Sequence, residues 1–304
     1  MGPKKPSLRL LLSMWWCVTL VWVAQAQDMD PVPKDGDLKI VTVAYQAFRV
    51  GYATGYLQPA WVAYRLSYRQ LGGEAERSTK FKREPELKGM DASDGDYRGT
   101  GLDRGHLVPA ADMAWSQRTM EESFSYANVC PQKPGFNRGV WKRTESQVRD
   151  WASALPWSDT LGLLVWAGPV LEQGMQRVGR LSVPHSYFKV VYHPQGQRVA
   201  AFLLAHHSSK AALVASMVPV DSIEKVTGLD LMSGLPDHFE ENLEKALCKE
   251  CWDWSNLAQS SANANPRREK GQDSAVLCSG TTKAGKACRK RTKDPSGRCP
   301  YHRN

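Results

Sequence analysis

Beyond residue 26 the sequence lacks any apolar stretch of the roughly 20 residues that a bilayer-spanning helix requires. This absence excludes a membrane-spanning body. Residues 1–26 lack acidic side chains but carry three basic ones, and an apolar run over residues 10–23 leads into Ala24-Gln25-Ala26. The order predicts a signal peptide over residues 1–26, with no membrane contact after its cleavage; the alternative, a membrane anchor, needs a longer apolar run. The cleavage site has no cysteine, which argues against a lipid anchor.

Cysteines are few in the body of the chain. Of the seven in the sequence, Cys17 leaves with the predicted signal peptide, Cys130 stands alone, Cys248 and Cys251 form a C-x-x-C pair, and three lie near the C-terminus. An exported chain is predicted to be periplasmic or secreted, where disulfides are the expectation for six remaining cysteines. Because the C-x-x-C pair follows a predicted helix rather than opening one, a structural disulfide is favoured over a redox pair.

The positive charge is concentrated at the C-terminus. The net charge of the whole chain is +9, but residues 266–304 hold 11 lysines and arginines against three acidic residues, and residues 27–265 have a net charge of −2. A polyanionic partner is therefore suggested mainly by the tail, and any basic groove on the body is local.

The hydrophobic pattern predicts a protein with both helices and a sheet. Strand-like runs lie over residues 38–45, 49–56, 61–67, 162–167, 187–192 and 199–204. Helical signals lie over residues 120–128, 137–154, 220–226 and 238–247. Strands in runs with helices inserted between them indicate an α+β architecture rather than regular βαβ alternation.

Three further segments have a distinct composition. Residues 72–103 are rich in charge and glycine without a clear period, which predicts a long loop. Small and polar residues are prominent over residues 257–276, which predicts a flexible linker after a domain over residues 27–256. Residues 277–304 are too short to bury a core, so this basic module needs a metal or disulfides to fold.

The candidate site begins at D-R-G-H, residues 103–106, where a cation, a glycine and an imidazole adjoin. Alone this is weak evidence, because a histidine beside a glycine is more often structural than catalytic. N-x-x-P-Q follows at residues 128–132, and Asn137 is followed eight residues later by Glu145. Eight residues are about two helical turns, so both side chains lie on one helix face and can approach the same hydrated cation.

Together these motifs resemble the DNA/RNA non-specific endonuclease family, the sugar-non-specific ββα-metal nucleases. The likeness rests on D-R-G-H, N-x-x-P-Q, N-x-G-x-W at residues 137–141 and Glu145, and it extends over about residues 38–247. It implies the ββα-metal nuclease fold, with a central, mainly antiparallel sheet flanked by helices. It also implies an Mg²⁺-dependent endonuclease that hydrolyses phosphodiester bonds in DNA and RNA with little sequence specificity.

The resemblance also implies roles for individual residues. His106 falls on the general base that activates water, Asn137 on the single direct metal ligand, and Glu145 on a partner that reaches the metal through water. Arg104 falls on a phosphate-contacting arginine of the catalytic set. The remaining assigned positions are Asp103, Asn128 and Gln132 for support of the site, and Arg77 and Arg138 for substrate binding.

Physical chemistry agrees with these roles. An imidazole of ordinary pKa is neutral at about pH 8 and can take a proton from water. Mg²⁺ retains most of its waters, so one asparagine oxygen and the phosphate oxygens of a substrate are sufficient ligands; Mn²⁺ is an alternative ion. A site that contacts the phosphate rather than the base or the 2′-hydroxyl cuts DNA and RNA alike.

Two other functional classes share parts of this pattern. A non-catalytic nucleic-acid-binding protein on a nuclease scaffold is expected to lack His106, Asn137 or Glu145, and all three are present. A different ββα-metal enzyme, specific for one nucleic-acid structure, shares the motifs. Loss of activity on replacing His106 separates an enzyme from a binding protein.

The tail contains a set of three thiols and an imidazole, at Cys278, Cys288, Cys299 and His302. Such a set completes a tetrahedral zinc site, and the C-x-x-H ending is a ligand-pair spacing. It resembles small C-terminal Cys3His modules appended to some bacterial proteins. Disulfide formation, with a cysteine of the C-x-x-C pair as a partner, is the alternative.

Six lysines and arginines lie between residues 283 and 293 of the tail. Clustered cations bind phosphates with a strong dependence on salt. We hypothesise that the tail tethers nucleic acid that the slightly acidic body holds weakly. The alternative is a solubilising or wall-binding extension.

Overall fold

A computed structural model gives the fold of the chain. It describes residues 30–34, 38–207 and 213–257, and in the tail residues 276–281, 285–288, 291–292, 296–298 and 302. The predicted signal peptide, most of the predicted linker and Cys299 lie outside these residues. The chain divides into two compact units, Met1–Trp254 and Ser255–Asn304.

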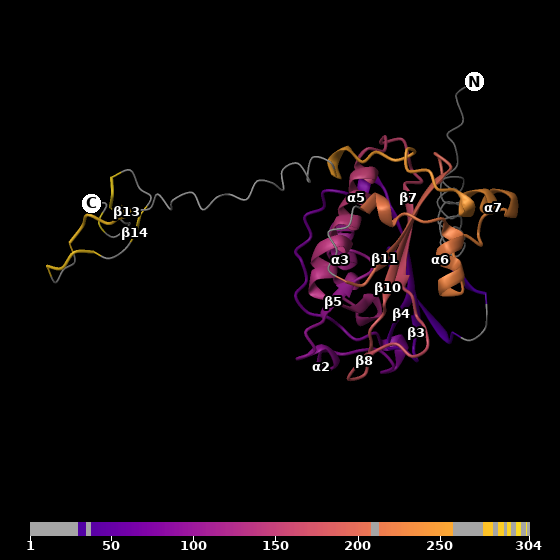
Figure 1. Cartoon of the computed structure of the whole chain (residues 1–304), viewed down its shortest axis with the longest axis horizontal. Coiled ribbons are helices and arrows are strands. Elements are labelled where there is room, and N and C mark those ends of the chain that lie inside the picture. Colours follow the sequence, from indigo (N-terminus) through magenta and orange to yellow (C-terminus); the bar gives the residue numbers. More distant parts are fainter. Residues whose placement is uncertain are drawn as a thin grey trace, which may run out of the picture. The chain divides into compact units, whose positions relative to one another are not determined.

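A six-stranded antiparallel sheet forms the centre of the first unit (Figure 1). The strand order is β11-β10-β7-β4-β3-β2, and each neighbouring pair is antiparallel. The strands are β2 (Ile40–Ala44), β3 (Phe48–Ala53), β4 (Gln58–Leu66), β7 (Leu163–Pro169), β10 (Ser186–His193) and β11 (Arg198–Ala205). The six predicted strands are confirmed with shifts of a few residues at their ends.

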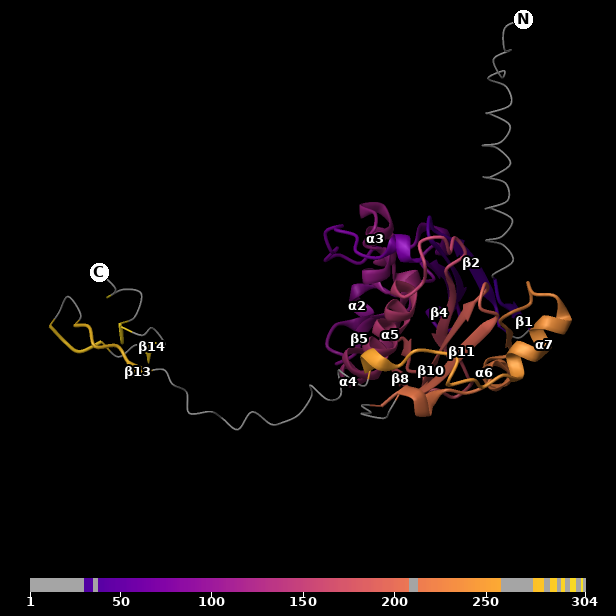
Figure 2. The same cartoon turned by 90° about the horizontal axis from the view of Figure 1, so that it is seen from above.

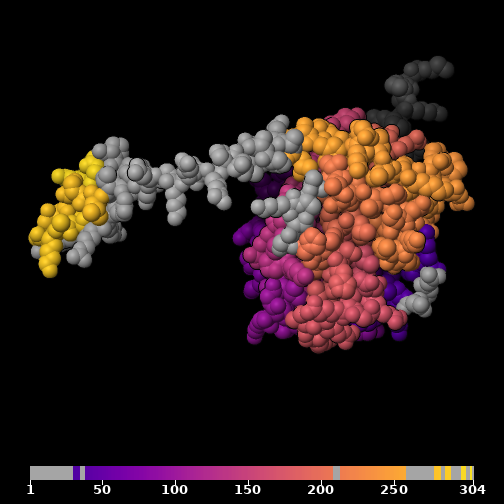
Figure 3. Space-filling model, in the orientation of Figure 1, coloured from indigo at the N-terminus to yellow at the C-terminus, as the bar shows by residue number. Residues whose placement is uncertain are grey.

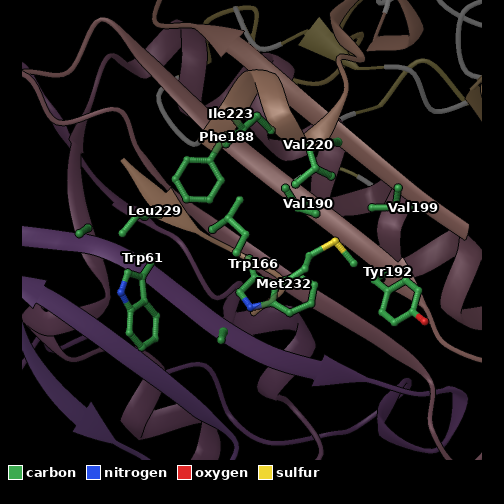
Figure 4. Packing of buried hydrophobic residues seen from close by; sticks show 14 of the residues in the cluster. Trp61, Trp166, Phe188, Val190, Tyr192, Val199, Val220, Ile223, Leu229 and Met232 are labelled. Atoms are coloured by element: carbon green, nitrogen blue, oxygen red, sulfur yellow. The ribbon is translucent and has the colours of Figure 1, made fainter. Parts of the chain in front are cut away.

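One face of the sheet packs against two helices, α6 (Val220–Thr227) and α7 (Asp237–Lys245). The side chains of a strand alternate between its two faces, and the side chains on this face bury a large apolar cluster against the helices. Those labelled in Figure 4 are Trp61, Trp166, Phe188, Val190, Tyr192, Val199, Val220, Ile223, Leu229 and Met232. Burying each large apolar side chain contributes about 1.5–3 kcal/mol, so this cluster anchors the sheet.

The opposite face carries the segment that contains the candidate site (Figures 1 and 2). Its helices are α3 (Gln117–Ser123), α4 (Pro134–Phe136), the wide helical segment η5 (Asn137–Trp141) and α5 (Lys142–Ser153). The helix predicted over residues 137–154 is therefore confirmed, with non-helical backbone angles at Gly139. The helix predicted over residues 120–128 ends at Ser123, because Ser125 caps a separate turn, η4 (Tyr126–Asn128).

Two strands that the hydrophobic pattern did not predict lie beside these helices. The D-R-G-H motif forms β5 (Asp103–His106), which pairs antiparallel with β6 (Val129–Gln132). With the helix that follows, this hairpin makes a ββα unit. In the space-filling view of Figure 3, the magenta surface of this unit lies on the left of the body and the orange surface of α6 and α7 on the right, while Trp252 and Asp253 contact α5.

The remaining elements are short. Paired strands are β1 (Val32–Pro33) with β12 (Leu229–Asp230), β8 (Arg177–Val178) with β9 (Leu181–Ser182), and in the tail β13 (Val276–Leu277) with β14 (Arg291–Thr292). Single turns are η1 (Tyr68–Gln70), η2 (Pro85–Leu87), α2 (Asp94–Tyr97), η3 (Ala110–Met113) and η6 (Leu213–Ser216). The predicted loop over residues 72–103 is largely irregular and contains η2 and α2. None of the described helices is long and apolar enough to cross a bilayer.

Candidate active site

The hairpin and the helix of the ββα unit are tied together by side-chain hydrogen bonds. Trp141 Nε1 donates to the main-chain oxygen of His106 at 3.0 Å, and Asn137 Nδ2 donates to Asp103 Oδ2 at 2.9 Å. Both donors come from the first turns of the helical segment, and both acceptors belong to β5. The helix is therefore fixed with its Asn137 end against the D-R-G-H strand.

An open pocket of about 530 Å³ lies where this unit meets the loop over residues 72–103. The predicted site residues that line it are Arg77, Asp103, Arg104, His106, Asn137, Arg138 and Glu145. Asn128 and Gln132 do not line it. The structure thus brings the predicted imidazole, carboxamide and carboxylate to one cavity although they span 39 positions of the chain.

His106 lies half-buried between two aromatic rings. Its ring centroid is 5.2 Å from that of Phe81 and 4.7 Å from that of Phe124. Burial, assisted by the charge of Arg77, lowers the pKa of His106 to about 3. Its Nε2 atom is buried without a hydrogen-bond partner. The imidazole is therefore uncharged, and one ring nitrogen remains unused by the protein.

Asn137 and Glu145 form a donor set that suits a hard cation. Because Asn137 Nδ2 is held by Asp103, the carboxamide oxygen is the end left for a ligand. Glu145 lines the same pocket two helical turns later, and no cysteine lines it. Oxygen donors from one or two side chains, with room for water, are what Mg²⁺ prefers. The residues therefore fit an Mg²⁺ ion.

Asp103 and Arg138 form an ion pair at the pocket wall. Arg138 Nε and Nη2 donate to the two carboxylate oxygens of Asp103 at 2.9 and 2.7 Å. The same carboxylate accepts the hydrogen bond from Asn137, so Asp103 orients the carboxamide. Arg138 is 73% exposed and can exchange this partner for a phosphate.

Arg104 and Arg77 present two more cations to the pocket. Arg104 is paired with Asp94, and its guanidinium lies 5.0 Å from the ring centroid of Phe81. Arg77 is exposed, and its guanidinium lies 5.1 Å from the ring centroid of Phe124. The aromatic rings that flank His106 thus also hold both arginines. A second pocket of about 460 Å³ adjoins the first and shares Asp103 and Arg104 with it.

Asn128 and Gln132 lie behind the pocket rather than in its lining. Asn128 Oδ1 accepts from the amide of Val108 at 2.9 Å, and its Nδ2 donates to the carbonyls of Val108 and Ser123. Gln132 is fully buried and pairs across the hairpin with Asp103, and a Cβ added at Gly105 would lie 2.2 Å from Gln132 Cδ. Glycine in D-R-G-H therefore makes room for Gln132.

A buried charge cluster behind the pocket was not predicted. Asp112 Oδ1 accepts from Arg149 Nη1 at 2.8 Å, and Asp112 Oδ2 accepts from Tyr64 Oη at 2.9 Å. Lys189 from β10 is fully buried, with Nζ 4.6 Å from the ring centroid of Trp141 and 3.4 Å from the carbonyl of Leu107.

This cluster acts electrostatically on the carboxylate of the pocket. Burial raises the pKa of Glu145, and the charges of Lys189 and Arg149 oppose that rise. Burial in turn lowers the pKa of Lys189, and the carboxylates of Glu145 and Asp112 oppose that fall. Lys189 and Arg149 are therefore the counter-charges that favour an ionised Glu145.

Two cations of the pocket, Lys142 and Arg149, were also missed at the sequence level. Helical spacing could have found them, because positions 138, 142, 145 and 149 recur at three- and four-residue intervals and so share a face. For Lys189 the sequence offers a weaker signal, a single lysine inside an apolar strand.

The sequence matches the model of the family described as DNA/RNA non-specific endonuclease over residues 27–238. It is 32% identical to the nuclease of Serratia marcescens over 198 residues, which are 60% of this chain and 72% of that protein. It is 35% identical to the mitochondrial nuclease 1 of Schizosaccharomyces pombe over 188 residues, 55% of each chain. It is 28% identical to human mitochondrial endonuclease G, covering 56% of this chain and 62% of that one.

The fold is similar to that of a solved structure titled as the EndoG/EndoGI complex, with a TM-score of 0.58 and 21% identity over 64% of this chain and 86% of that chain. The match therefore shows an α+β ββα-metal nuclease fold. With some relatives the matched region is little more than half of the relative's own length. The match to the family model covers well over half of this chain, which therefore belongs to the DNA/RNA non-specific endonuclease family.

Proposed function

We propose that this chain is an Mg²⁺-dependent nuclease that hydrolyses phosphodiester bonds in DNA and RNA with little sequence specificity. One observation carries the proposal. A single pocket contains an uncharged imidazole, an oxygen donor set for a hard cation and several cations. Hydrolysis of a phosphodiester requires these three elements, because water must lose a proton and the transition state gains negative charge.

His106 is proposed to accept the proton of the attacking water at Nδ1, because Nε2 is buried away from solvent and the ring lines the pocket. Its main chain is held by Trp141 and its ring by Phe81 and Phe124, so the ring is oriented before substrate binds. A low pKa makes the free imidazole a weak base. The phosphate of a bound substrate adds negative charge that offsets the charge of Arg77 and raises the basicity of His106.

Asn137 is proposed to hold the Mg²⁺ ion directly and Glu145 to hold it through water. When bound, the ion supplies charge stabilisation to the departing oxygen. Asp103 keeps the carboxamide in one orientation through its bond to Asn137 Nδ2. Burial raises the pKa of Glu145 to about 7, and the charges of Lys189 and Arg149 limit that rise and so favour the anionic form that a cation site needs.

Four cations are proposed to hold the nucleic-acid backbone: Arg77, Arg104, Arg138 and Lys142. Contacts to phosphates position a nucleic acid but carry no base information. The adjoining pocket at Arg104 offers room for the neighbouring nucleotide. Phosphate recognition without base or 2′-hydroxyl contacts accounts for cleavage of both DNA and RNA.

We also propose that the protein acts outside the cytoplasm, in the periplasm or after secretion. The sequence of residues 1–26 supports export. A second support is the disulfide between Cys248 and Cys251, because disulfides persist mainly in oxidising compartments.

The metal role is tested by degradation of plasmid DNA and of a structured RNA by the full chain. Both substrates should be degraded with Mg²⁺ and remain intact with a chelator. Asn137→Ala should require much more Mg²⁺ or fail to cut, whereas Asn242→Ala, on the outer helix α7, should match the wild type. Undiminished cutting in chelator would contradict a metal nuclease, and tight binding without cutting would instead indicate a non-catalytic nucleic-acid-binding protein.

A further inference from the structure

Three potential metal ligands meet in the C-terminal unit. Cys278 Sγ, Cys288 Sγ and a ring nitrogen of His302 lie within 4.8 Å of one another. Cys278 Sγ is 3.4 Å from His302 Nδ1. In a tetrahedral zinc site, bond lengths of about 2.3 Å to sulfur and about 2.0 Å to nitrogen place these two atoms roughly 3.5 Å apart. The observed spacing is therefore that of two ligands of one zinc ion.

Backbone hydrogen bonds of the unit bring these three ligands together although they are distant in sequence. Strand β13 leads into Cys278 and pairs with β14, which follows Cys288. The amide of Cys288 donates to the carbonyl of Gly280 at 2.9 Å, and the amide of Ser279 donates to the carbonyl of Gly297 at 2.9 Å. These bonds hold both thiols and the segment before His302 together.

The lack of a side chain at Gly280 makes room for the imidazole of His302. A Cβ atom added at Gly280 would lie 2.4 Å from His302 Cγ and 2.6 Å from His302 Nδ1, so no larger residue allows this approach. The amide of Gly280 also donates to Cys278 Sγ at 3.3 Å. An N–H group directed at sulfur favours the thiolate form, as hydrogen bonds to metal ligands commonly do.

The cysteines of the first unit are not available as disulfide partners for the tail cysteines. Cys248 and Cys251 are joined in a disulfide, which removes the partner considered for the tail. Cys130 is fully buried in the core of the first unit, and burial raises its pKa. Once Cys17 leaves with the predicted signal peptide, three cysteines remain, at positions 278, 288 and 299. An odd number cannot pair completely in disulfides within one chain, whereas a Cys3His zinc site uses all three.

We propose that the C-terminal unit binds one structural Zn²⁺ ion through Cys278, Cys288 and His302. The sequence assigns Cys299, three residues before His302, as the fourth ligand, although Cys299 lies outside the described residues. A unit of about this size cannot bury enough apolar surface to fold alone, and a metal ion supplies the missing stabilisation. The ion is separate from the Mg²⁺ proposed for the pocket, because zinc prefers thiolate and imidazole where magnesium prefers oxygen.

The metal content of the purified full chain tests this proposal without reference to nuclease activity. We expect one zinc per chain after extensive dialysis. Replacement of zinc by Co²⁺ should give the thiolate-to-cobalt charge-transfer absorption and the intense visible bands of tetrahedral coordination. Cys278→Ser, Cys288→Ser and His302→Ala should each lose both signals.

Two further variants separate ligation from general damage to the hairpin. Gly280→Ala retains every ligand but displaces the imidazole, so its zinc affinity should fall by roughly 10- to 100-fold. Thr281→Ala changes an exposed neighbour on the same hairpin and should bind zinc like the wild type. Cys299→Ser should weaken binding if the sequence assignment of the fourth ligand is correct.

Three results would overturn the proposal. A wild-type chain that contains no zinc and takes up none under reducing conditions has no such site. Zinc retained in both Cys278→Ser and His302→Ala would place the ion elsewhere. Tail cysteines that react with a thiol reagent only after reduction would show disulfides instead. In each case the Mg²⁺-dependent cleavage assay remains interpretable, since it depends on the other unit.

Discussion

The two faces of the central sheet differ in what they bury. On the face toward α6 and α7, Trp166, Phe188 and Val190 pack into an apolar cluster. On the face toward α5, the next residue along the same strand is Lys189, which is as fully buried as Phe188. One strand therefore supplies an apolar anchor on one side and a buried cation on the other.

This difference follows from what each face must support. Apolar burial stabilises the fold at about 25 cal/mol per Å² and requires no polar partner. A buried ammonium group loses its hydration and is retained only where opposite charges and hydrogen bonds compensate. Lys189 has the carboxylates of Glu145 and Asp112 as compensation. We infer that the α6–α7 face mainly determines stability and that the α5 face mainly sets the electrostatics of the pocket.

The largest expected effect is the loss of nuclease activity on replacing a pocket residue on the α5 face. His106→Ala should lower kcat/KM on a DNA duplex by about 10²- to 10⁴-fold, the usual contribution of a general base. Its free energy of unfolding should fall by less than that of Phe188→Ala, because the half-buried ring loses packing on Phe81 and Phe124 but no hydrogen bond from Nε2. Steady-state kinetics and urea denaturation measure the two quantities. His185→Ala, at an exposed histidine outside the pocket, is the control, and an active His106→Ala protein would end the proposed mechanism.

The converse effect is expected on the α6–α7 face. Phe188→Ala should lower the free energy of unfolding by about 3–5 kcal/mol, because it leaves a cavity in the apolar cluster. Turnover by the folded fraction should remain near that of the wild type. Phe239→Ala, at an exposed position of α7, should change stability by less than about 0.5 kcal/mol. Loss of kcat in a folded Phe188→Ala protein would contradict the division between the faces.

The apolar face was the part of the fold most predictable from sequence. A strand was predicted over residues 61–67, and in β4 the alternate residues Trp61 and Ala63 face the apolar cluster, since strand side chains have a period of two. The β5–β6 hairpin was missed for a physical reason. D-R-G-H is polar, and β6 contains Pro131, which has no amide to donate and argues against a strand except at an edge.

Candidate site residues could be predicted where they belong to a sequence motif. Residues that approach the site only through tertiary packing were harder to predict. His106, Asn137 and Glu145 could be named as candidates from their motifs, and they line one pocket. Lys189 lies behind the pocket only because β10 packs under the helix, a contact between segments more than 40 residues apart. Such contacts follow from the assembled fold and have no local pattern.

A third test concerns a buried histidine of the α5 face. His206 accepts a hydrogen bond from the amide of Lys133 at Nε2, and its Nδ1 donates to the carbonyl of Pro184, each at 2.7 Å. This network needs the neutral ring, and burial lowers the pKa of His206 to about 4. In the unfolded chain the pKa is about 6.5, so protonation favours unfolding as the pH falls from about 6.5 to about 4.

The resulting loss should amount to about 2–3 kcal/mol of unfolding free energy across that window. Above about pH 6.5 the contribution of the neutral ring is fully present. His206→Gln cannot gain a charge there, so its stability relative to the wild type should rise as the pH falls. Urea midpoints of both proteins between these pH values provide the measurement. A constant difference would show that His206 does not titrate with unfolding.

The smallest expected effect is that of replacing the buried cation, Lys189, on the pH dependence of activity. Lys189→Met keeps the volume and removes the charge that favours ionised Glu145, so the pKa of Glu145 should rise further. At about pH 7 the activity should fall roughly tenfold for each unit of that rise and recover as the pH increases, which moves the acidic limb of the kcat/KM profile to higher pH.

Stability should change less than in Phe188→Ala, because Asp112 keeps Arg149 and Tyr64 as partners. Lys245→Met, at an exposed lysine of α7, should leave the profile in place. An unmoved profile in Lys189→Met would mean that the buried lysine stabilises the fold as Phe188 does, and the two faces of the sheet would then differ in composition but not in role.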